Sequence, residues 1–198
     1  MSTGRLVVAV SGASGAIYAQ RFLRAAAPHY SEIFLMLSRQ AIQVAETELG
    51  IRLDRAAFST KEWLGAEFEN IQLLDEKNYF TPPASGSFSH DGMVIVPCSM
   101  GTIGRIAHGI SDDLVTRSAD VCLKEGRKLI VVPREMPWNV IMLRNLTTLA
   151  EAGVTVLPAC PAWYTRPASL EELADTVVAR ILQHLGVKQT LMKEWMHE

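Results

Sequence analysis

One short segment of the sequence, Ser11-Gly12-Ala13-Ser14-Gly15, combines small and hydroxyl residues in a way that suits an anionic ligand. It lies between an apolar run and a segment with helical periodicity. Glycines let the backbone approach a phosphate closely, and a helix that begins here offers free N–H groups and the positive end of its dipole. The segment therefore suits a phosphorylated ligand, although a tight turn that binds nothing explains it equally well.

The spacing within this turn disfavours two common ligand classes. A dinucleotide-binding turn needs G-x-G-x-x-G and an acidic residue near the end of the second strand. Here the glycines are Gly12 and Gly15, the second strand is expected to end at Ser38-Arg39, and a Walker lysine is missing. NAD and ATP are therefore disfavoured. FMN remains compatible, because flavodoxin-like sheets bind it where the strand order reverses.

A second turn of this kind, Pro97-Cys98-Ser99-Met100-Gly101-Thr102, follows the apolar run 93–96. If the two turns follow neighbouring parallel strands, they form one polar crevice at the same edge of the sheet. Cys98 in this turn could serve as a nucleophile. A small buried thiol is the more common role of such a cysteine, and we favour that interpretation.

Arg117, Asp120 and Lys124 are spaced by three and four residues, which places them on one face of a helix. On spacing alone, a solvated face with salt bridges is the favoured interpretation. The alternative is an anion site that this face shares with another subunit.

Arg134 and Glu135 follow an apolar run and are flanked by two prolines. A carboxylate at the carboxyl end of a buried strand would lie in the ligand crevice and could perform acid–base chemistry. Tyr164 follows the last apolar run and brings a hydroxyl to the same edge. Arg180 lies at the border of an apolar helical stripe, where it either meets an anionic partner or extends into solvent.

An alternation of strands and helices must position these residues. Near-continuous apolar runs indicate strands of a parallel sheet that is covered on both faces. We therefore predict an α/β fold: a three-layer, doubly wound, mostly parallel sheet of the Rossmann or flavodoxin-like kind. The predicted strands are Arg5–Val10, Ile33–Leu37, Met93–Pro97, Leu129–Pro133 and Val154–Leu157, and the predicted helices are Ala16–Ala27, Arg39–Leu49, a stripe over 142–150 and Leu170–Leu185.

Local signals add detail to this scheme. Ser169 and Glu172 form a capping box before the last helix, and Gly186 ends it. Residues 50–90 hold two prolines and a Ser-Gly-Ser turn, and are interpreted as an excursion or long loop. We expect one domain over residues 1–198, with a C-terminal tail from about residue 187.

Composition excludes several classes of protein. With 48% apolar and 20% charged residues, the 198-residue chain is expected to fold rather than remain disordered. Nineteen basic and 21 acidic residues give a net charge of −2, which argues against a nucleic-acid partner. No apolar run is long enough to span a membrane, and no signal peptide is evident. The mean hydropathy of +0.13 hints at buried subunit interfaces.

The sulfur and imidazole residues give no metal-binding pattern. The three cysteines are widely spaced without a CxxC pair, which predicts reduced thiols in a cytoplasmic protein. The five histidines show no ligand spacing, so we predict that no metal is bound.

Taken in order, several motifs resemble those of the UbiX-like flavin prenyltransferases, a family that includes partner proteins of aromatic-acid decarboxylases. The likeness runs from about Leu6 to Trp195, and its specificity comes from the combination of motifs rather than from any one of them. The motifs are SGASGA at Ser11–Ala16, SGS at Ser85–Ser87, PCSMGT at Pro97–Thr102, RSADVCLKE at Arg117–Glu125, PREMP at Pro133–Pro137, PAWY at Pro161–Tyr164, and Arg180 within VVARIL.

The resemblance implies an activity: a dimethylallyl group is joined from dimethylallyl phosphate to N5 and C6 of reduced FMN. The product would be prenylated FMN, which UbiD-like decarboxylases use as their cofactor. No metal is implied, because arginine and lysine can neutralise the leaving phosphate. The family assembles into large symmetric homo-oligomers, commonly dodecamers, with sites at subunit junctions. Whether the donor is the monophosphate or the diphosphate stays open.

The resemblance also implies roles for individual residues. Four acid–base or hydroxyl residues are expected to be catalytic, and Trp195 matches an aromatic residue near the C-terminus. The expected catalytic residues are Ser14, Glu46, Glu135 and Tyr164; the FMN-binding residues are Gly12, Ala13, Ser14, Ser38, Ser99, Met100, Gly101, Thr102 and Arg134; and the residues at the donor phosphate are Ser87, Arg117, Lys124, Tyr164 and Arg180.

The chain departs from the usual pattern of this family at a few positions. Residues 75–84 form a longer segment, and Arg105 stands where a smaller apolar residue is more common. Trp138 and Trp163 stand where Leu or Phe is more common. These departures bear on substrate fit and subunit contacts rather than on the chemistry.

Two other functions remain as alternatives. An FMN-dependent cysteine decarboxylase of similar fold would have a histidine soon after the first strand region and an asparagine-bearing second turn, and the sequence has neither. A non-catalytic flavin carrier within a decarboxylase complex is the other alternative. Lys124 and Arg180 argue against it, because a carrier needs no site for a leaving phosphate.

Overall fold

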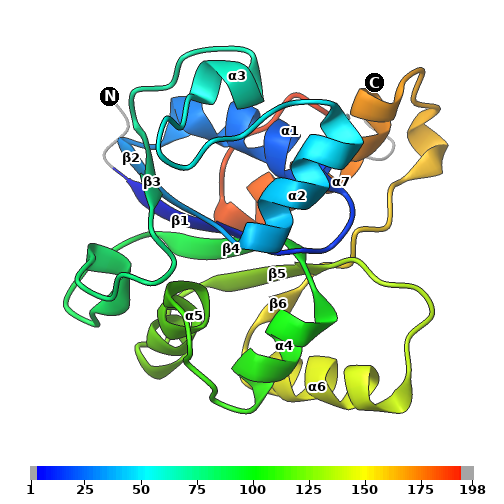
Figure 1. The fold of residues 1–198 in the computed structure, drawn as a ribbon. Coiled ribbons are helices and arrows are strands. Elements are labelled where there is room, and N and C mark those ends of the chain that lie inside the picture. The colour runs from blue at the N-terminus through cyan, green and yellow to red at the C-terminus, as the bar shows by residue number, and fades with distance from the viewer. Residues whose placement is uncertain (1–3, 193–198) are drawn as a thin grey trace.

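The computed structural model describes residues 4–192 and shows one six-stranded parallel sheet with helices on both faces (Figure 1). The strand order is β3-β2-β1-β4-β5-β6, so the order reverses between β1 and β4. In sheets of this kind, ligands bind outside the carboxyl ends of the strands at the reversal. The strands are β1 (Arg5–Val10), β2 (Glu32–Leu37), β3 (Ile71–Leu74), β4 (Gly92–Cys98), β5 (Leu129–Pro133) and β6 (Thr155–Val156).

The two central strands show why the strand sequences are almost continuously apolar. Every residue of β4 is buried, and so is every residue of β1 except Arg5. Val7 of β1 lies beside Phe34 of β2 on one side and Met93 of β4 on the other. Because helices cover both faces of the sheet, both sides of each strand need apolar side chains. The predicted three-layer parallel fold is confirmed.

The helices divide between the two faces (Figure 1). Helices α1, α2, α3 and α7 pack on one face, and α4, α5 and α6 pack on the other. Their bounds are α1 (Ala16–Ala26), α2 (Arg39–Leu49), α3 (Thr60–Leu64), α4 (Met100–Ala107), α5 (Leu114–Lys124), α6 (Val140–Glu151) and α7 (Leu170–Leu185), with 3₁₀ turns η1 (Ala27–His29), η2 (Pro82–Ala84) and η3 (Trp163–Thr165).

The predicted ends of α7 are present with one change. The Ser169 side chain accepts a hydrogen bond from the Glu172 backbone N–H at 3.1 Å. The Glu172 carboxylate accepts from the backbone N–H of Ala168 at 2.7 Å, one residue before the position that a capping box uses. Gly186 ends the helix in the left-handed region with φ of 79°.

The interpretation of residues 50–90 as a long loop is wrong in part, because this region contains α3, β3 and η2. Strand β3 has four residues at the edge of the sheet, and only Ile71 and Leu74 are buried. Helix α3 has five residues, although its Trp63 is almost fully buried. Elements this short repeat a hydrophobic period at most twice, which gives too weak a signal to tell them from a loop.

Helix α6 leaves much apolar surface exposed. Of the predicted stripe over 142–150, Leu146 and Leu149 are buried, whereas Leu143 is 46% exposed. Val140 and Ile141 at the start of α6 are also exposed. Contiguous exposed apolar surface is typical of a face that contacts another molecule.

Candidate functional site

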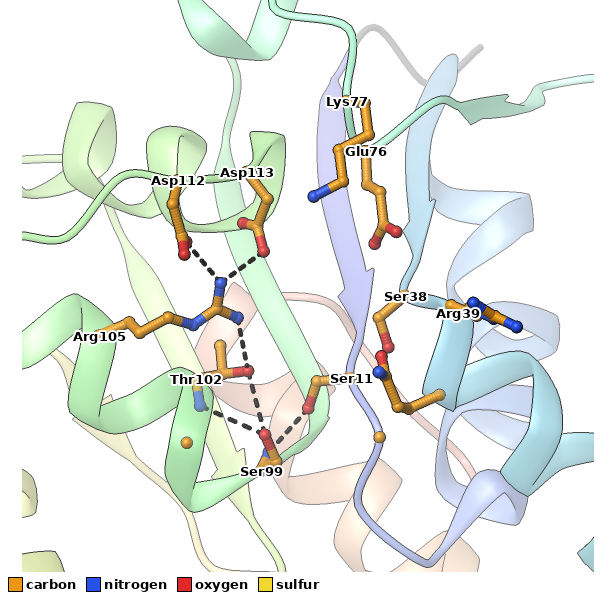
Figure 2. Close-up of a pocket in the computed structure, with 13 residues that line it drawn as sticks. Ser11, Ser38, Arg39, Glu76, Lys77, Ser99, Thr102, Arg105, Asp112 and Asp113 are labelled. Atoms are coloured by element: carbon orange, nitrogen blue, oxygen red, sulfur yellow. Dashed lines mark hydrogen bonds and ion pairs between the residues drawn. The ribbon is translucent and has the colours of Figure 1, made fainter.

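A cavity of about 660 Å³ lies at the carboxyl edge of the sheet, where the strand order reverses between β1 and β4 (Figure 2). Both predicted turns contribute to it, together with the start of α2 and the segments after β3 and α4. The lining residues are Ser11, Gly12, Ser38, Arg39, Gln40, Glu76, Lys77, Ser99, Gly101, Thr102, Arg105, Asp112 and Asp113. Five residues predicted to bind FMN are thus brought together: Gly12, Ser38, Ser99, Gly101 and Thr102.

Ser11 joins the two turns. Its hydroxyl donates to the carbonyl of Pro97 at 3.0 Å and accepts from the backbone N–H of Ser99 at 2.7 Å. Ser11 is buried, so these hydrogen bonds are shielded from water. They fix the first turn against the second and set the floor of the cavity.

Two helix N-termini face the cavity. The Ser38 side chain caps α2 by accepting from the Ala41 N–H at 3.0 Å, and the Ser99 side chain caps α4 by accepting from the Thr102 N–H at 3.2 Å. The two helix dipoles therefore place positive potential on the same space. Such an arrangement favours an anionic group.

The two glycines of the turns, Gly12 and Gly101, differ in the space around them. A Cβ atom on Gly12 would overlap the Cβ of Gln40, so only glycine fits between this turn and α2. A Cβ on Gly101 would meet only the Ser99 hydroxyl, at 3.9 Å, which shows open space beside α4. The first turn therefore packs tightly against α2, whereas the second turn leaves open space beside α4.

Arg105 forms one wall of the cavity (Figure 2). Its Nη1 atom lies 2.6 Å from a carboxylate oxygen of Asp112 and 2.6 Å from one of Asp113. Burial by itself would raise the pKa of Asp113, but hydrogen bonds from Thr116 and Arg105 outweigh burial and lower it. Asp113 also caps α5 by accepting from the Thr116 N–H at 2.8 Å, so the arginine is held by a fixed carboxylate.

A second polar group, next to the first turn, connects β5 with α1 and α2. The Arg134 Nε–H donates to the carbonyl of Ser14 at 3.0 Å. The Glu48 carboxylate accepts from the N–H groups of Gly15 and Ala16, each at 2.8 Å. Burial would raise the pKa of Glu48, but hydrogen bonds from the Ser14 side chain and these N–H groups lower it, and Arg134 adds to this effect.

Glu48, rather than Glu46, therefore belongs to this group. The Glu46 carboxylate instead accepts from the backbone N–H of Leu53 at 3.3 Å. The two residues are two positions apart in α2, so their side chains point in different directions. The buried residues Ala41 and Ala45 give the signal that identifies Glu48, because positions 41, 45 and 48 share one helix face.

Other predicted residues at this edge are less enclosed. The side chains of Ala13 and Met100 are buried in the core, so only their backbone atoms could meet a ligand. Glu135 is exposed, and its carboxylate accepts from the backbone N–H of Met136 at 3.1 Å. Tyr164 is half exposed, and its hydroxyl lies 3.8 Å from the sulfur of Met192.

The residues predicted to meet the donor phosphate form two separate groups within one chain. Arg117 on α5 donates through Nε to the Ala84 carbonyl at 3.2 Å and pairs with Asp120 at 2.9 Å. A Cβ on Gly86 would lie 2.7 Å from the Lys124 ammonium, so the Ser85–Ser87 turn lies against Lys124. Ser87, Arg117 and Lys124 are thus together.

Arg180 lies on the other face of the sheet, on α7, where its Nη1 donates to the Gln183 side chain at 2.6 Å. Helix α5 runs from Asp113 beside the cavity back toward the start of β5, so Lys124 lies near the amino edge of the sheet. The structure of one chain therefore does not bring Arg117 and Lys124 to Tyr164 and Arg180. Trp195 lies outside the described residues.

Cys98 is fully buried beneath the second turn, and burial raises its pKa strongly. A thiol in this state is a poor nucleophile, which supports the interpretation as a small packed residue. Among residues 4–192, no cluster of three or more His, Cys, Asp or Glu side chains is arranged to hold a metal ion. No helix within the same range is long and apolar enough to cross a membrane.

Comparisons of sequence place these features in a family. The sequence pattern of the flavoprotein family matches residues 1–184. The flavin prenyltransferase UbiX of Thermoplasma acidophilum is 46% identical, over 96% of this chain and 99% of its own. That of Pseudomonas aeruginosa is 41% identical, over 96% of this chain and 93% of its own.

Comparisons of structure agree. AnUbiX (PadA1), solved in complex with FMN and dimethylallyl pyrophosphate, has a TM-score of 0.88 and 34% identity over 98% of each chain. A dodecameric FMN-dependent UbiX-like decarboxylase from Escherichia coli O157:H7 has a TM-score of 0.85 and 35% identity, over 98% of this chain and 100% of that one. The cysteine decarboxylase TvaF, with a TM-score of 0.61 and 20% identity, shares the fold alone. This chain belongs to the flavoprotein family and, within it, to the UbiX flavin prenyltransferases.

Proposed function

We propose that this chain transfers a dimethylallyl group from dimethylallyl phosphate to N5 and C6 of reduced FMN, giving prenylated FMN for a UbiD-like decarboxylase. The observation that carries the proposal is the cavity between β1 and β4, which offers two hydroxyl-rich turns and two helix N-termini to one ligand. Full-length relatives with the UbiX name support the reaction type.

The residues around the cavity fit FMN. Its volume of about 660 Å³ lies within the range of small-molecule and cofactor sites. The donor set of hydroxyl groups, backbone N–H groups and cations suits a phosphate ester and its polyol chain. Gly101 leaves open space for a close approach beside α4, and no carboxylate is needed to hold a second ribose.

We assign the binding of FMN to the two turns and their neighbours. The assigned residues are Gly12, Ser38, Ser99, Gly101 and Thr102 around the cavity, Ser14 and Arg134 beside it, and Ala13 and Met100 through their backbone atoms. Reduced flavin supplies electron-rich N5 and C6 atoms when it is bound. The remaining chemistry belongs to the residues that meet the prenyl donor.

The prenyl donor loses its phosphate when the allylic C–O bond breaks, and the phosphate leaves with the bonding electron pair. Cations and hydrogen-bond donors aimed at that phosphate stabilise the charge as it develops. We assign this task to Ser87, Arg117, Lys124, Tyr164 and Arg180. Glu48 takes the place that the sequence resemblance gave to Glu46, and with Glu135 it is proposed to hold or move protons at the site.

The donor site is proposed to form between subunits. Arg117 and Lys124 lie on one face of the sheet and Arg180 on the other, so a neighbouring chain must complete the set. The dodecameric relative and the exposed apolar side chains Met136, Val140 and Ile141 support a homo-oligomer, which we propose to be a dodecamer.

A cytoplasmic location is proposed as well. All three cysteines are free thiols, with Cys98 and Cys122 buried and Cys160 exposed. Free thiols persist in a reducing compartment.

The test is an anaerobic incubation of the protein with reduced FMN and dimethylallyl phosphate, with mass spectrometry and absorbance of the released flavin. The expected result is a mass gain of one prenyl unit and a changed spectrum, absent when either substrate is left out. A parallel reaction with the diphosphate identifies the donor. If neither donor gives a mass gain while FMN binds, the proposed transfer is wrong and a flavin carrier becomes the better account.

A further inference from the structure

Arg105 stands out among the cations around the cavity because its guanidinium points into the cavity and is held in place. In Figure 2, Arg105 and Lys77 approach the middle of the cavity from two sides, whereas Arg39 points away from it. Lys77 is exposed on the segment after β3, and its ammonium group is carried by a long, flexible side chain. Arg105 is only partly exposed and has three protein partners.

The three partners leave a defined part of the guanidinium available. Both Nη1–H groups are engaged, one by Asp112 and one by Asp113, and one Nη2–H reaches the Thr102 hydroxyl oxygen at 3.4 Å. A guanidinium carries five N–H donors. The Nε–H and the second Nη2–H therefore donate to no acceptor within residues 4–192, and both belong to a side chain that lines the cavity.

The side chains that line the cavity carry no net charge, because three cations balance three carboxylates: Arg39, Lys77 and Arg105 against Glu76, Asp112 and Asp113. Asp112 and Asp113 pair with Arg105, and Glu76 pairs with Arg55 at 3.4 Å. Thr102 links Arg105 to the Ser99 hydroxyl, 3.1 Å away, and so to the N-terminus of α4. One wall of the cavity is thus a continuous hydrogen-bonded chain of side chains, from Ser99 through Thr102 to the guanidinium of Arg105.

We infer that Arg105 is the residue that makes the cavity specific for a flavin with a terminal phosphate, and that it separates FMN from riboflavin. This inference rests on the proposed binding of FMN in the cavity. A phosphate monoester carries nearly two negative charges near neutral pH, and a guanidinium binds it with two N–H donors in a fixed geometry. Asp112 and Asp113 are positioning residues, because they orient the guanidinium before the ligand arrives and so reduce the entropy lost on binding.

The test measures the dissociation constants of FMN and riboflavin, by flavin fluorescence, for the wild type and for Arg105→Met, Arg105→Lys and Arg144→Met. Arg144 is an exposed arginine on α6 outside the cavity, so its replacement removes the same charge elsewhere. Arg105→Met is expected to weaken FMN about 10- to 100-fold, because a charge-assisted hydrogen bond is lost, and to leave riboflavin within about twofold. Arg105→Lys is expected to recover part of the FMN affinity. Arg144→Met is expected to change neither constant.

The riboflavin arm separates this role from a structural one. If Arg105 only ties α4 to the start of α5, its replacement weakens FMN and riboflavin by the same factor or changes neither, and the inference is wrong. If Arg105→Met does not fold, as judged by circular dichroism, Arg105→Lys decides, and an unchanged ratio of the two constants overturns the inference. Because binding is measured without turnover, a wild type that discriminates FMN through Arg105 but transfers no prenyl group would contradict only the proposed function.

Discussion

The crevice between β1 and β4 and the group around Lys124 on α5 both hold cations and hydroxyl groups, but they differ in completeness. In the crevice, strands, helix N-termini and two joined turns from one chain surround a cavity. Around Lys124, the cations lie at the surface and pair with acidic side chains of their own helix and its end, Asp120 and Glu125. One chain thus builds an enclosed site in the first region and only part of a site in the second.

This difference teaches how the two substrates of the proposed reaction are handled. A flavin can be held by a single subunit, because the carboxyl ends of parallel strands gather the necessary groups. The donor phosphate needs groups from both faces of the sheet, which one chain cannot bring together. Five measurements test this contrast, in order of decreasing expected effect.

The largest effect is expected from removing one cation on each side of the proposed donor site. Lys124→Ala and Arg180→Ala should each lower the rate of prenyl transfer about 100- to 1,000-fold, because one donor to the developing charge is lost. The affinity for FMN should remain unchanged, since neither residue lines the cavity. Lys61→Ala, at an exposed position of α3 outside both regions, is the control. Weaker FMN binding in either variant would contradict the division into two regions.

Mixing the two variants tests whether the cations come from different subunits. After subunit exchange, some sites should contain a native Lys124 from one chain and a native Arg180 from its neighbour, so part of the activity should return. The measurement is the transfer rate before and after exchange, with exchange verified by native mass spectrometry. Verified exchange without recovery would mean that both cations act from the same chain.

A smaller effect is expected from adding a methyl group to the turns of the crevice. Gly12→Ala should lower the free energy of unfolding by about 1–3 kcal/mol, because its Cβ overlaps the Cβ of Gln40 and the turn must shift. Gly101→Ala is the matched control, since its Cβ meets only the Ser99 hydroxyl at 3.9 Å. It should keep the stability and weaken FMN binding. Chemical denaturation and flavin titration give the two quantities, and equal stability of both variants would argue against the tight fit beside α2.

Glu48 provides a test with a defined pH dependence. Its pKa is lowered on folding, so its carboxylate stabilises the folded state above its usual pKa of 4.5, and this contribution is lost as the pH falls through the folded value. Glu48→Gln should therefore lower the unfolding free energy at pH 7 by at most about 1 kcal/mol, since the side chain is exposed and screened. The difference from the wild type should vanish near pH 3.

Glu46→Gln serves as the control for this test, because the Glu46 carboxylate accepts from the Leu53 backbone N–H, whereas that of Glu48 accepts from the first turn. Denaturation curves at pH 7 and at acidic pH measure the stability, and prenyl transfer is measured on the same samples. A loss of transfer with Glu46→Gln but not with Glu48→Gln would restore the residue that the sequence suggested.

The smallest effect is expected for the reactivity of the thiols. Cys98 is buried beside the crevice, and Cys122 is buried on α5 near Lys124. Burial raises the pKa of Cys122 to about 12 and also raises that of Cys98. At neutral pH a thiol reagent should therefore react rapidly with Cys160 alone in the native protein, and with all three thiols after denaturation. Cys160→Ser should remove the native reaction. A second fast thiol in the native protein would show that one of the two regions opens readily.

The central architecture could be predicted from sequence because its elements are long and buried on both sides. The predicted bounds of β1, Arg5–Val10, and of α2, Arg39–Leu49, agree with the structure, and the two turns that follow β1 and β4 share one cavity as expected. Topology alone makes these turns neighbours, since parallel strands place their carboxyl ends at one edge. The short elements α3 and β3 carried too few residues for a periodic signal.

The site was less accessible to prediction than the fold. The choice between Glu46 and Glu48 depends on which face of α2 meets the first turn. The structure identifies that face, because Ala41 and Ala45 are buried on it. The role of Arg105 depends on how the connection after α4 folds back to bring Asp112 and Asp113 against its guanidinium. The sequence grouped the phosphate residues by function, whereas the fold places them on two faces of the sheet.

Helix α5 connects the two regions that this comparison separates. Its first turn is capped by Asp113 beside the cavity, and its last residue, Lys124, lies against the Ser85–Ser87 turn. Eleven helical residues span about 16 Å and turn by about 100° per residue. One residue inserted in the middle of α5 would leave the Asp113 end in register and rotate Lys124 by about 100° away from its turn. The length of α5 therefore sets both the distance between the two regions and the direction in which Lys124 points.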